Sequence, residues 1–327
     1  MRIIERVSDI EGGQRGAVVT IGNFDGVHLG HQQILAAAKK AAQEGRRPLL
    51  AITFEPHPVT VLKPDKSPGV LTPLRLKCHY LAQAGVDCLI ILKSTPELLG
   101  LSAEDFVDRY LEKAIAPAVV IEGHDFNFGR ARSGNIEKLR QLGAEKNFEV
   151  RIVEPKNIVL STGQSIRVSS TFIRELLERG AVADAARALG RAYRLIGKVI
   201  PGHGKGKQLG FPTANLERTE QVVPAHGVYA GRVEIGRSVE QVCQTRDRIP
   251  AALSIGHAPT VAADRPQLIE AHLLIDNVGH LIGKSLAMDF IQHLRPQRKF
   301  DSEEHLAQQI KDDCSKAREI LNATWEG

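Results

Sequence analysis

The sequence predicts two domains: an α/β domain with a parallel sheet, then a mainly-β domain that forms an antiparallel barrel with a C-terminal helix. Strand-like and helix-like segments alternate over residues 17–153, which is typical of βαβ units. From residue 193 to residue 291 the chain instead shows apolar runs separated by turn residues, which is typical of an antiparallel sheet or small barrel. A chain of 327 residues is long enough for about two domains of ordinary size.

In the first domain, short apolar runs predict the strands and capping residues predict the helix starts. The expected strands are 17–21, 48–54, 86–92, 118–121 and 149–153, and the expected helices are 30–44, 73–84, 103–115 and 135–146. Thr72 precedes Pro73 at the start of the second helix. Ser102 and Asp105 form a capping box at the start of the third. We expect helices on both faces of the sheet and ligands at the carboxyl ends of its strands.

The second domain follows two short helical segments at 171–179 and 182–189. Its expected strands are 195–200, 227–235, 251–255, 268–275 and 285–291, and a last helix is expected from Ser302 to about Asn322. We place the domain boundary near residue 185, between domains 1–184 and 185–327.

The composition excludes several classes of protein. With 43% hydrophobic and 25% charged residues, the chain is neither disordered nor collagen-like. No apolar run approaches the ~18 residues of a membrane span, and the N-terminus lacks the apolar stretch of a secretory signal. The four cysteines lie far apart without metal-ligand spacing, so we expect reduced thiols in the cytoplasm. The net charge of +5 comes without a basic run interleaved with aromatic residues, so neither nucleic acid nor a membrane is an expected partner. Nothing in the sequence indicates the oligomeric state.

The segment 21–31 places a glycine-rich loop between a buried strand and a helix. Backbone N–H groups and the helix dipole favour an anion at such a position. His28 and His31 are three residues apart and Gly30 allows close approach of the backbone, so both imidazoles can donate to phosphate oxygens. The alternative, ordinary polar residues at a helix start, fits a lone histidine better than the whole segment. The candidate nucleotide-binding residues here are Gly22, Asn23, Phe24, Asp25 and Gly30.

A second polar segment, 169–174, begins another helix. In the simplest interpretation, the hydroxyl groups of Ser169, Ser170 and Thr171 cap the helix and Arg174 is solvated. In the functional interpretation, the same groups bind a triphosphate. Both polar segments would lie at the carboxyl ends of parallel strands, which favours the functional interpretation.

The glycine-rich segment 202–215 has the spacing of neither a P-loop nor a dinucleotide-binding fingerprint. It is either a flexible connection between strands or a loop that binds phosphate and leads to magnesium ligands. The candidates are Gly202, Gly204 and Lys207 for phosphate, and Thr213 and Asn215 for magnesium.

Glu270 lies in the middle of the strand expected at 268–275. A carboxylate there is either solvated on the outer face of the sheet or placed to accept a proton as a general base. The residues by themselves favour the solvated position.

The motifs of the first half resemble the nucleotidyltransferase superfamily and, within it, the bacterial bifunctional riboflavin kinase/FMN adenylyltransferases (FAD synthetases). The matching motifs are GNFDG and HxGH within 22–31, FEPHP at 54–58, GHDFNFG at 123–129 and SSTxIR at 169–174. The resemblance implies a Rossmann-like fold in which His28 and His31 bind and polarise the phosphates of ATP. It also implies that Asn23 and Asp125 help to place nucleotide and flavin, and that the residues of 169–174 hold phosphates. The implied reaction converts FMN and ATP to FAD and pyrophosphate, with magnesium and without a covalent intermediate.

The second half resembles the riboflavin kinase module of the same family. The matching motifs are GxxxGxxLGFPTANL at 202–216, GVY at 227–229, Gly256 with Pro259-Thr260, and a glutamate in a strand. The resemblance implies that Glu270 takes the proton of the ribityl 5′-hydroxyl of riboflavin, while Thr213 and Asn215 bind magnesium with ATP. The chain is therefore expected to convert riboflavin to FMN and FMN to FAD.

Four residues depart from the family pattern. The family usually has asparagine where Ser254 stands, arginine or asparagine at Ala258, tyrosine at Ile282 and glutamate at Gln297. These departures leave open an FMN adenylyltransferase with a weakened or inactive kinase module. A flavin- or nucleotide-binding regulator that contacts nucleic acid is an alternative of a different class, against which the intact HxGH and PTxN motifs argue.

Overall fold

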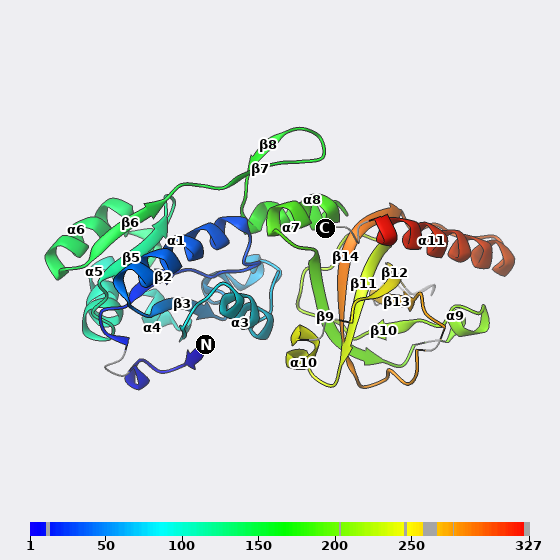
Figure 1. Cartoon of the computed structure of the whole chain (residues 1–327), viewed down its shortest axis with the longest axis horizontal. Helices are drawn as coiled ribbons and strands as arrows, with labels where there is room; N and C mark the ends of the chain where they lie inside the picture. Colours follow the sequence, from blue (N-terminus) through cyan, green and yellow to red (C-terminus); the bar gives the residue numbers. More distant parts are fainter. Residues whose placement is uncertain (11–13, 203, 245–246, 258–266, 277, 324–327) are drawn as a thin grey trace. The chain divides into compact units, whose positions relative to one another are not determined.

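The computed structural model describes residues 1–10, 14–202, 204–244, 247–257, 267–276 and 278–323 (Figure 1). The described chain divides into two units. The first comprises Met1–Pro68, Lys77–Ile158 and Ser165–Val168. The second comprises Gly69–Leu76, Val159–Gln164 and the chain from Ser169 onward. The domain boundary near residue 185 stays a prediction.

A six-stranded sheet with the order β1-β4-β3-β2-β5-β6 forms the centre of the first unit, and all neighbouring strands in it are parallel. Its strands are β1 (Arg2–Ile4), β2 (Val18–Ile21), β3 (Leu49–Glu55), β4 (Cys88–Lys93), β5 (Val119–Gly123) and β6 (Glu149–Val153). The expected parallel α/β architecture is confirmed. Strand β1 was not predicted, because its three residues are too few to show a periodic pattern.

The helices of this part of the chain are α1 (Leu29–Gly45), α2 (Pro58–Leu62), α3 (Leu74–Gln83), α4 (Pro96–Leu99), α5 (Ala103–Phe106) and α6 (Ile136–Lys146), with 3₁₀ helices at Val7–Asp9, Pro64–Lys66 and Arg130–Arg132. Four of them, α1, α3, α5 and α6, begin close to where they were expected, whereas α2, α4 and the 3₁₀ helices were not predicted. Ser102 is confirmed as the N-cap residue, since its Oγ accepts the backbone N–H of Asp105 at 3.0 Å and donates to Oδ2 of Asp105 at 2.8 Å. The helix expected at 103–115 is α-helical only at its start and continues as a wider π-helix, Val107–Lys113.

Both faces of the parallel sheet are buried. On one face Val19 and Val120 pack in a hydrophobic cluster with Phe106 and Leu139, which come from α5 and α6. The alternate strand residues, such as Val18, point to the other face and are also buried. There α1 contacts β2, β3 and β5. Helices therefore cover both faces of the sheet, as expected for βαβ units.

The order of the strands changes direction between β2 and β5. From β2 the chain adds β3 and β4 on one side, whereas β5 and β6 lie on the other side. The ladder between β2 and β5 pairs Val18 with Val119 and Val19 with Val120. Open parallel sheets bind ligands at the carboxyl ends of the strands where the order reverses. The loop that follows β2 starts at this position.

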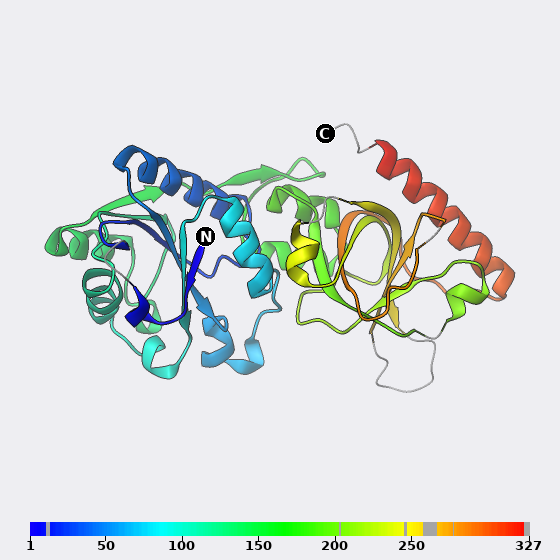
Figure 2. The same ribbon diagram turned by 60° about the horizontal axis from the view of Figure 1, so that its bottom comes forward.

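The second unit contains a closed barrel of antiparallel strands in the order β10-β13-β12-β11-β14-β9. Its strands are β9 (Tyr193–Ile200), β10 (Ala214–Leu216), β11 (Gly227–Gly236), β12 (Ile249–His257), β13 (Gln267–Leu273) and β14 (Ser285–Arg295). Figure 2 shows these strands curving around a closed interior. The expected barrel is confirmed. A two-stranded sheet, β7 (Asn157–Val159) and β8 (Ser165–Arg167), precedes it in the chain.

The helices of the second half include the expected long C-terminal helix. They are α7 (Ser170–Glu178), α8 (Val182–Leu189), α9 (Lys205–Gln208), α10 (Val239–Gln244) and α11 (Glu303–Ala323). Helix α11 runs along the outside of the barrel (Figure 2), where Cys314 and Ala317 pack in one cluster with Ala230 and Ala252. Among the helices described, none combines the length and the apolar character needed to cross a membrane.

Candidate active sites

The loop between β2 and α1 has a strained backbone. Three of its residues have positive φ: Phe24 at 47°, Gly26 at 85° and Val27 at 38°. For phenylalanine and valine this conformation costs free energy unless the surroundings hold it. The loop is anchored at its start, where the N–H of Gly22 donates to the carbonyl oxygen of Ile52 at 2.9 Å. Strain of this kind is concentrated at functional sites.

His28 and His31 lie together at the start of α1. His28 is the N-cap residue, and its Nδ1 accepts the backbone N–H of His31 at 3.3 Å. The two rings stack with their centroids 3.7 Å apart. Because Nδ1 is the acceptor, a neutral His28 carries its hydrogen on Nε2, the atom that would donate to a phosphate oxygen. The structure thus brings together the two histidines that the sequence analysis paired.

Gly30 provides the close approach expected of it. A Cβ at this position would lie 3.1 Å from Cε1 of His28 and 3.9 Å from the carbonyl oxygen of Val168. Val168 is the residue before Ser169 in the chain. Phe24 packs the edge of its ring against His31, with centroids 5.4 Å apart. A side chain at position 30 would therefore press on the ring of His28, which glycine avoids.

The polar residues of the loop differ in their surroundings. The side-chain amide of Asn23 forms a hydrogen bond with Nε2 of His57 at 3.0 Å, which joins the GNFDG and FEPHP motifs. Asp25 is buried. Asp125 lies after β5, exposed, and forms an ion pair with Arg167 at 2.7 Å. Asn23 is thus held by a second motif, whereas Asp125 is accessible to a ligand.

A cluster of phenylalanines lies near the carboxyl ends of β3 and β5, and the sequence analysis missed it. It consists of Phe54, Phe106, Phe126 and Phe128, whose neighbouring ring centroids lie between 5.4 and 6.4 Å apart. Phe54 and Phe126 are partly buried against the core. Their positions near strand ends, inside two of the quoted motifs, were the signal available in the sequence.

The segment that begins at Ser169 forms the start of α7 in the second unit. Oγ of Ser169 accepts the backbone N–H three residues later at 3.2 Å, so its capping role is confirmed. Ser170 and Thr171 occupy the first turn. Nε of Arg174 donates to the carbonyl oxygen of Gly69 at 2.7 Å. Phosphate binding by these residues stays a prediction.

In the barrel, Thr213, Asn215 and Glu270 lie together. Asn215 is directly opposite Glu270 in the pairing of β10 with β13, so the two side chains share one face. Oγ1 of Thr213 donates to Oε1 of Glu270 at 3.4 Å. Glu270 is partly exposed and alternates along β13 with buried residues, so it lies on the less buried face of the strand, and its role as a base stays a prediction. The three residues combine a hydroxyl, an amide and a carboxylate in one place.

The glycine-rich loop before β10 approaches these residues closely. A Cβ on Gly202 would lie 2.1 Å from Nδ2 of Asn215, which is less than any real contact of this kind. A Cβ on Gly206 would lie 3.4 Å from Oγ1 of Thr213. A side chain at position 202 would therefore displace the amide of Asn215, and phosphate binding by this loop stays a prediction.

Gly204 and Lys207 belong to the same loop. Gly204 has φ of 73°, in the left-handed region that favours glycine. The backbone of Lys207 lies in α9, but the description does not extend to its side chain. Binding of phosphate by either residue stays a prediction.

Among the described residues, no three histidine, cysteine, aspartate or glutamate side chains come together as a metal site. The four cysteines are thiols, and burial raises the pKa of Cys314 to about 11. Raised thiol pKa values disfavour the reactive thiolate and fit structural cysteines.

Two family models match the chain: the FAD synthetase model over residues 11–172 and the riboflavin kinase model over residues 189–321. The bifunctional riboflavin kinase/FMN adenylyltransferase of Escherichia coli (strain K12) is 34% identical over 325 residues, covering 99% of each chain. The enzyme of the same name from Pseudomonas fluorescens is 36% identical over 321 residues, covering 98% of each. The chain belongs to the bifunctional riboflavin kinase/FMN adenylyltransferase family.

One solved structure is similar to this family member over nearly its whole length. It is a crystal structure described as a macrolide-efflux protein from Streptococcus pneumoniae, with a TM-score of 0.83 and 29% sequence identity. The match covers 97% of this chain and 98% of that one. The two proteins therefore share both units of the fold.

Two of the four departures from the family pattern are bonded to each other. Nε2 of Gln297 donates to Oγ of Ser254 at 2.9 Å and to the carbonyl oxygen of Ile255 at 3.1 Å. Ser254 is directly opposite Glu270 in the pairing of β12 with β13. The altered pair thus adjoins the barrel site and is held by the two hydrogen bonds of Gln297. Ile282 is 50% exposed, and Ala258 lies outside the described residues.

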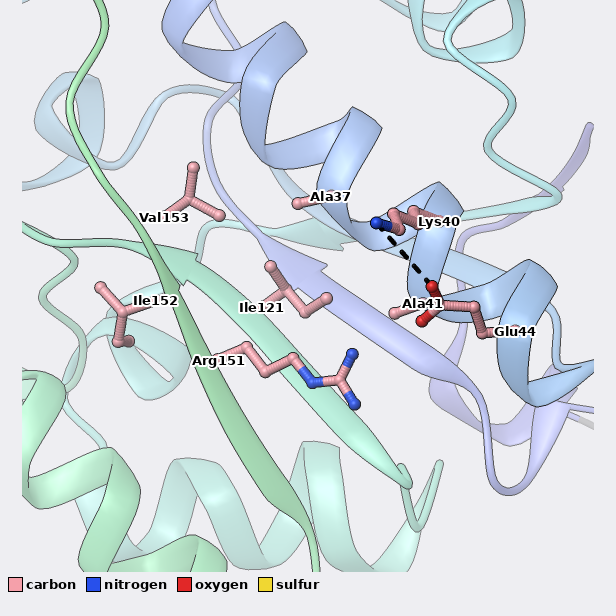
Figure 3. Close-up of a pocket in the computed structure, with 8 residues that line it drawn as sticks. All are labelled: Ala37, Lys40, Ala41, Glu44, Ile121, Arg151, Ile152 and Val153. Carbon is pink, nitrogen blue, oxygen red and sulfur yellow. Dashed lines mark ion pairs between the residues drawn. The ribbon is translucent and has the colours of Figure 1, made fainter.

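A separate pocket of about 280 Å³ lies between α1 and strands β5 and β6 (Figure 3). It is lined by Ala37, Lys40, Ala41, Glu44, Ile121, Arg151, Ile152 and Val153. The charged groups are paired, Lys40 with Glu44 at 4.0 Å and Arg151 with Glu149 at 2.7 Å. None of the candidate site residues lines this pocket, which adjoins the later turns of α1 rather than its start.

Proposed function

We propose that the chain catalyses two consecutive reactions of flavin cofactor synthesis. Riboflavin and ATP give FMN and ADP, and FMN and a second ATP give FAD and pyrophosphate. The observation that carries this proposal is the presence of two separate sets of reactive residues. The histidine pair lies at the start of α1, and the hydroxyl–amide–carboxylate cluster lies in the barrel. Membership of the bifunctional family supports one reaction for each set.

In the kinase reaction, Glu270 would take the proton of the ribityl 5′-hydroxyl. The resulting alkoxide character lets that oxygen attack the γ-phosphorus of ATP, and the bond to the ADP oxygen breaks. The contact between Thr213 and Glu270 at 3.4 Å supports this role, because it orients the carboxylate inside the cluster.

The barrel cluster fits a magnesium ion that arrives with ATP. The hydroxyl of Thr213 and the amide oxygen of Asn215 are hard oxygen donors, which magnesium prefers. They would supply two ligands, and phosphate oxygens and water would complete the shell, which leaves Glu270 beside them as the base. When bound, the ion would offset the negative charge of the phosphates. Gly202, Gly204 and Lys207 would hold these phosphates through backbone N–H groups and a counter-charge.

In the adenylyl transfer, His28 and His31 would bind the phosphates of ATP. The phosphate of FMN attacks the α-phosphorus and the bond to pyrophosphate breaks, with no covalent intermediate on the protein. A hydrogen bond from Nε2 of His28 would stabilise the oxygen that gains charge in the transition state. The further residues proposed to hold nucleotide or flavin are Gly22, Asn23, Phe24, Asp25, Gly30, Asp125, Ser169, Ser170, Thr171 and Arg174.

The phenylalanine cluster is suited to the isoalloxazine ring of FMN. Aromatic rings stack on planar ligands in offset or edge-to-face arrangements. Phe54 and Phe126 are partly exposed and lie near the carboxyl ends of two strands, where ligands of such sheets bind. The cluster would orient the flavin so that its phosphate faces ATP.

The first experiment is chromatography of the products after incubation of the pure protein with riboflavin, ATP and magnesium. FMN followed by FAD is the expected result and would establish both activities. Unchanged riboflavin, with FAD formed only when FMN is supplied, would support the alternative of an impaired kinase module. If no FAD forms either from riboflavin or from supplied FMN, the proposal is contradicted.

The alternative rests on the pair of Ser254 and Gln297 beside Glu270. A double-mutant comparison tests it: Ser254→Asn, Gln297→Glu and the two together, assayed for FMN formation at saturating riboflavin. If the double variant is much faster than the natural chain, the kinase module is impaired. If it is no faster, the hydrogen-bonded pair is a sufficient replacement, which is the result we expect from the contact between Gln297 and Ser254.

Replacing Gly202 with alanine should inactivate the kinase reaction. The added Cβ would lie 2.1 Å from Nδ2 of Asn215 and must displace that amide. Misplacement of a positioned group by about 1 Å costs about 100-fold, so FMN formation should fall by about that factor. Gly45→Ala is the control, since a Cβ there would approach the flexible side chain of Arg47 at 3.0 Å and Gly45 lies far from the barrel cluster in the sequence. A Gly202→Ala protein with full kinase activity would show that Asn215 can move without loss.

We also propose that the protein works in the cytoplasm on small molecules alone, without nucleic acid or membrane as a partner. The sequence has no basic run interleaved with aromatic residues, which supports the part of this proposal that concerns nucleic acid. Sequence-selective binding of nucleic acid would contradict it and would revive the regulator as the alternative.

A further inference from the structure

Glu122 is a buried carboxyl group that the proposed reactions do not use. It lies in β5, where the other residues are valine, isoleucine and glycine, and it is 2% exposed. Burial raises the pKa of Glu122 well above its ordinary value, against a smaller lowering by a backbone hydrogen bond from Ile21. The side chain therefore favours its neutral, protonated form.

Its side-chain oxygen takes the place of a backbone acceptor in the sheet. The ladder between β2 and β5 ends where Val19 pairs with Val120, so the two strands separate beyond that point. Two residues further on, the N–H of Ile21 donates to Oε1 of Glu122 at 2.6 Å instead of to a carbonyl group of β5. A buried N–H without an acceptor would be costly. Glu122 therefore provides the acceptor for the last N–H of β2 that faces β5, at the point where the strand order reverses.

Ile21 is the residue from which the loop to α1 departs. The next N–H, that of Gly22, donates in the other direction to Ile52 of β3 at 2.9 Å. The loop thus leaves the sheet between two held N–H groups, one bonded to β3 and the other to Glu122. The positive φ of Phe24, a few residues on, persists only when such anchors determine the path of the chain.

We propose that Glu122 is a positioning residue for adenylyl transfer, which holds the strand end from which the loop leading to His28 starts. The inference rests on the proposed function of the His28 site. A neutral acid suits this place, because it accepts the N–H of Ile21 without adding negative charge near an anion-binding loop.

Two substitutions test the proposal in the full-length protein. Glu122→Gln keeps the length and an accepting oxygen, so it should retain the wild-type kcat for FAD formation from FMN. Glu122→Leu keeps the bulk but removes the acceptor, so that kcat should fall about 10- to 100-fold. The kcat for FMN formation from riboflavin in the same protein should not change. Hydrogen exchange should show faster exchange at the Ile21 amide in Glu122→Leu than in Glu122→Gln.

Val120→Ala is the matched control, since Val120 is fully buried in the same strand and its apolar side chain accepts no hydrogen bond from the chain. It should lower the melting temperature but keep both kcat values in assays well below that temperature. A Glu122→Leu protein with wild-type kcat would overturn the proposal. So would an equal loss of kinase activity, or the same loss in Val120→Ala, since either indicates general damage. If the wild-type protein forms no FAD from FMN, the proposed function fails instead. The inference would then be tested by hydrogen exchange alone, and an unchanged exchange rate of the Ile21 amide in Glu122→Leu would overturn it.

Discussion

Replacing His28 with alanine should stop the formation of FAD from FMN while FMN still accumulates from riboflavin. The substitution removes the Nε2 donor that we assign to the phosphate oxygen gaining charge in the transition state. Loss of one such donor costs about 100- to 1,000-fold in kcat, and His28 also supports the stacked ring of His31. The measurement is the rate of FAD and FMN formation, each from its own substrate, in the same preparation.

Alanine also removes the N-cap of α1, which costs about 1 kcal/mol of stability. His28→Asn separates the two effects, because asparagine is a good N-cap but lacks the imidazole donor. It should be as inactive in adenylyl transfer as His28→Ala and more stable to heat. His79→Ala, in α3, is the control and should keep both activities. A His28→Asn protein that forms FAD at the wild-type rate would refute the assignment.

Replacing Glu270 should have the reverse effect, blocking FMN formation from riboflavin but sparing the conversion of supplied FMN to FAD. General-base catalysis contributes about 100- to 10,000-fold, so a loss in this range is expected for Glu270→Ala. Glu270→Gln is the sharper variant, since its amide oxygen can still accept the hydrogen bond from Thr213 but cannot take up a proton at neutral pH.

A Glu270→Gln protein with near-normal kinase activity would show that the carboxylate positions Thr213 rather than acting as a base. Loss of both activities in a folded Glu270 or His28 variant would contradict the model of separate sites. Circular dichroism and melting temperature provide the test of folding for each variant.

Much of the fold followed from the sequence because the patterns there are local. The alternation of apolar runs and capped helices predicted β2 to β6, and the hydrogen bond from the backbone N–H of Asp105 confirmed Ser102 as an N-cap residue. The short elements β1 and β10 were missed, since three residues show no reliable period. Each is a strand because a neighbour supplies its partners: β4 for β1, and β13 and β9 for β10.

The candidate sites were predicted in part. His28 with His31, and Thr213 with Asn215, are close in the sequence, so their spacing could be read directly. Glu270 could not be assigned from the residues by themselves, because its neighbourhood depends on the pairing of β13 with β10. The phenylalanine cluster likewise joins residues from separate segments and had no single motif.

By itself, the sequence determined the two-domain α/β and barrel architecture, the helix starts and the motifs that carry the family resemblance. These features depend on hydrophobic periodicity, capping residues and short-range spacing, which are properties of a continuous stretch of chain. The tertiary structure decided which distant groups meet. In it, Glu270 lies opposite Asn215 and Gln297 donates a hydrogen bond to Ser254. The N–H of Ile21 donates to Glu122, which is 101 residues away in the sequence. Strand pairing and burial set those contacts, and neither has a signature in local composition.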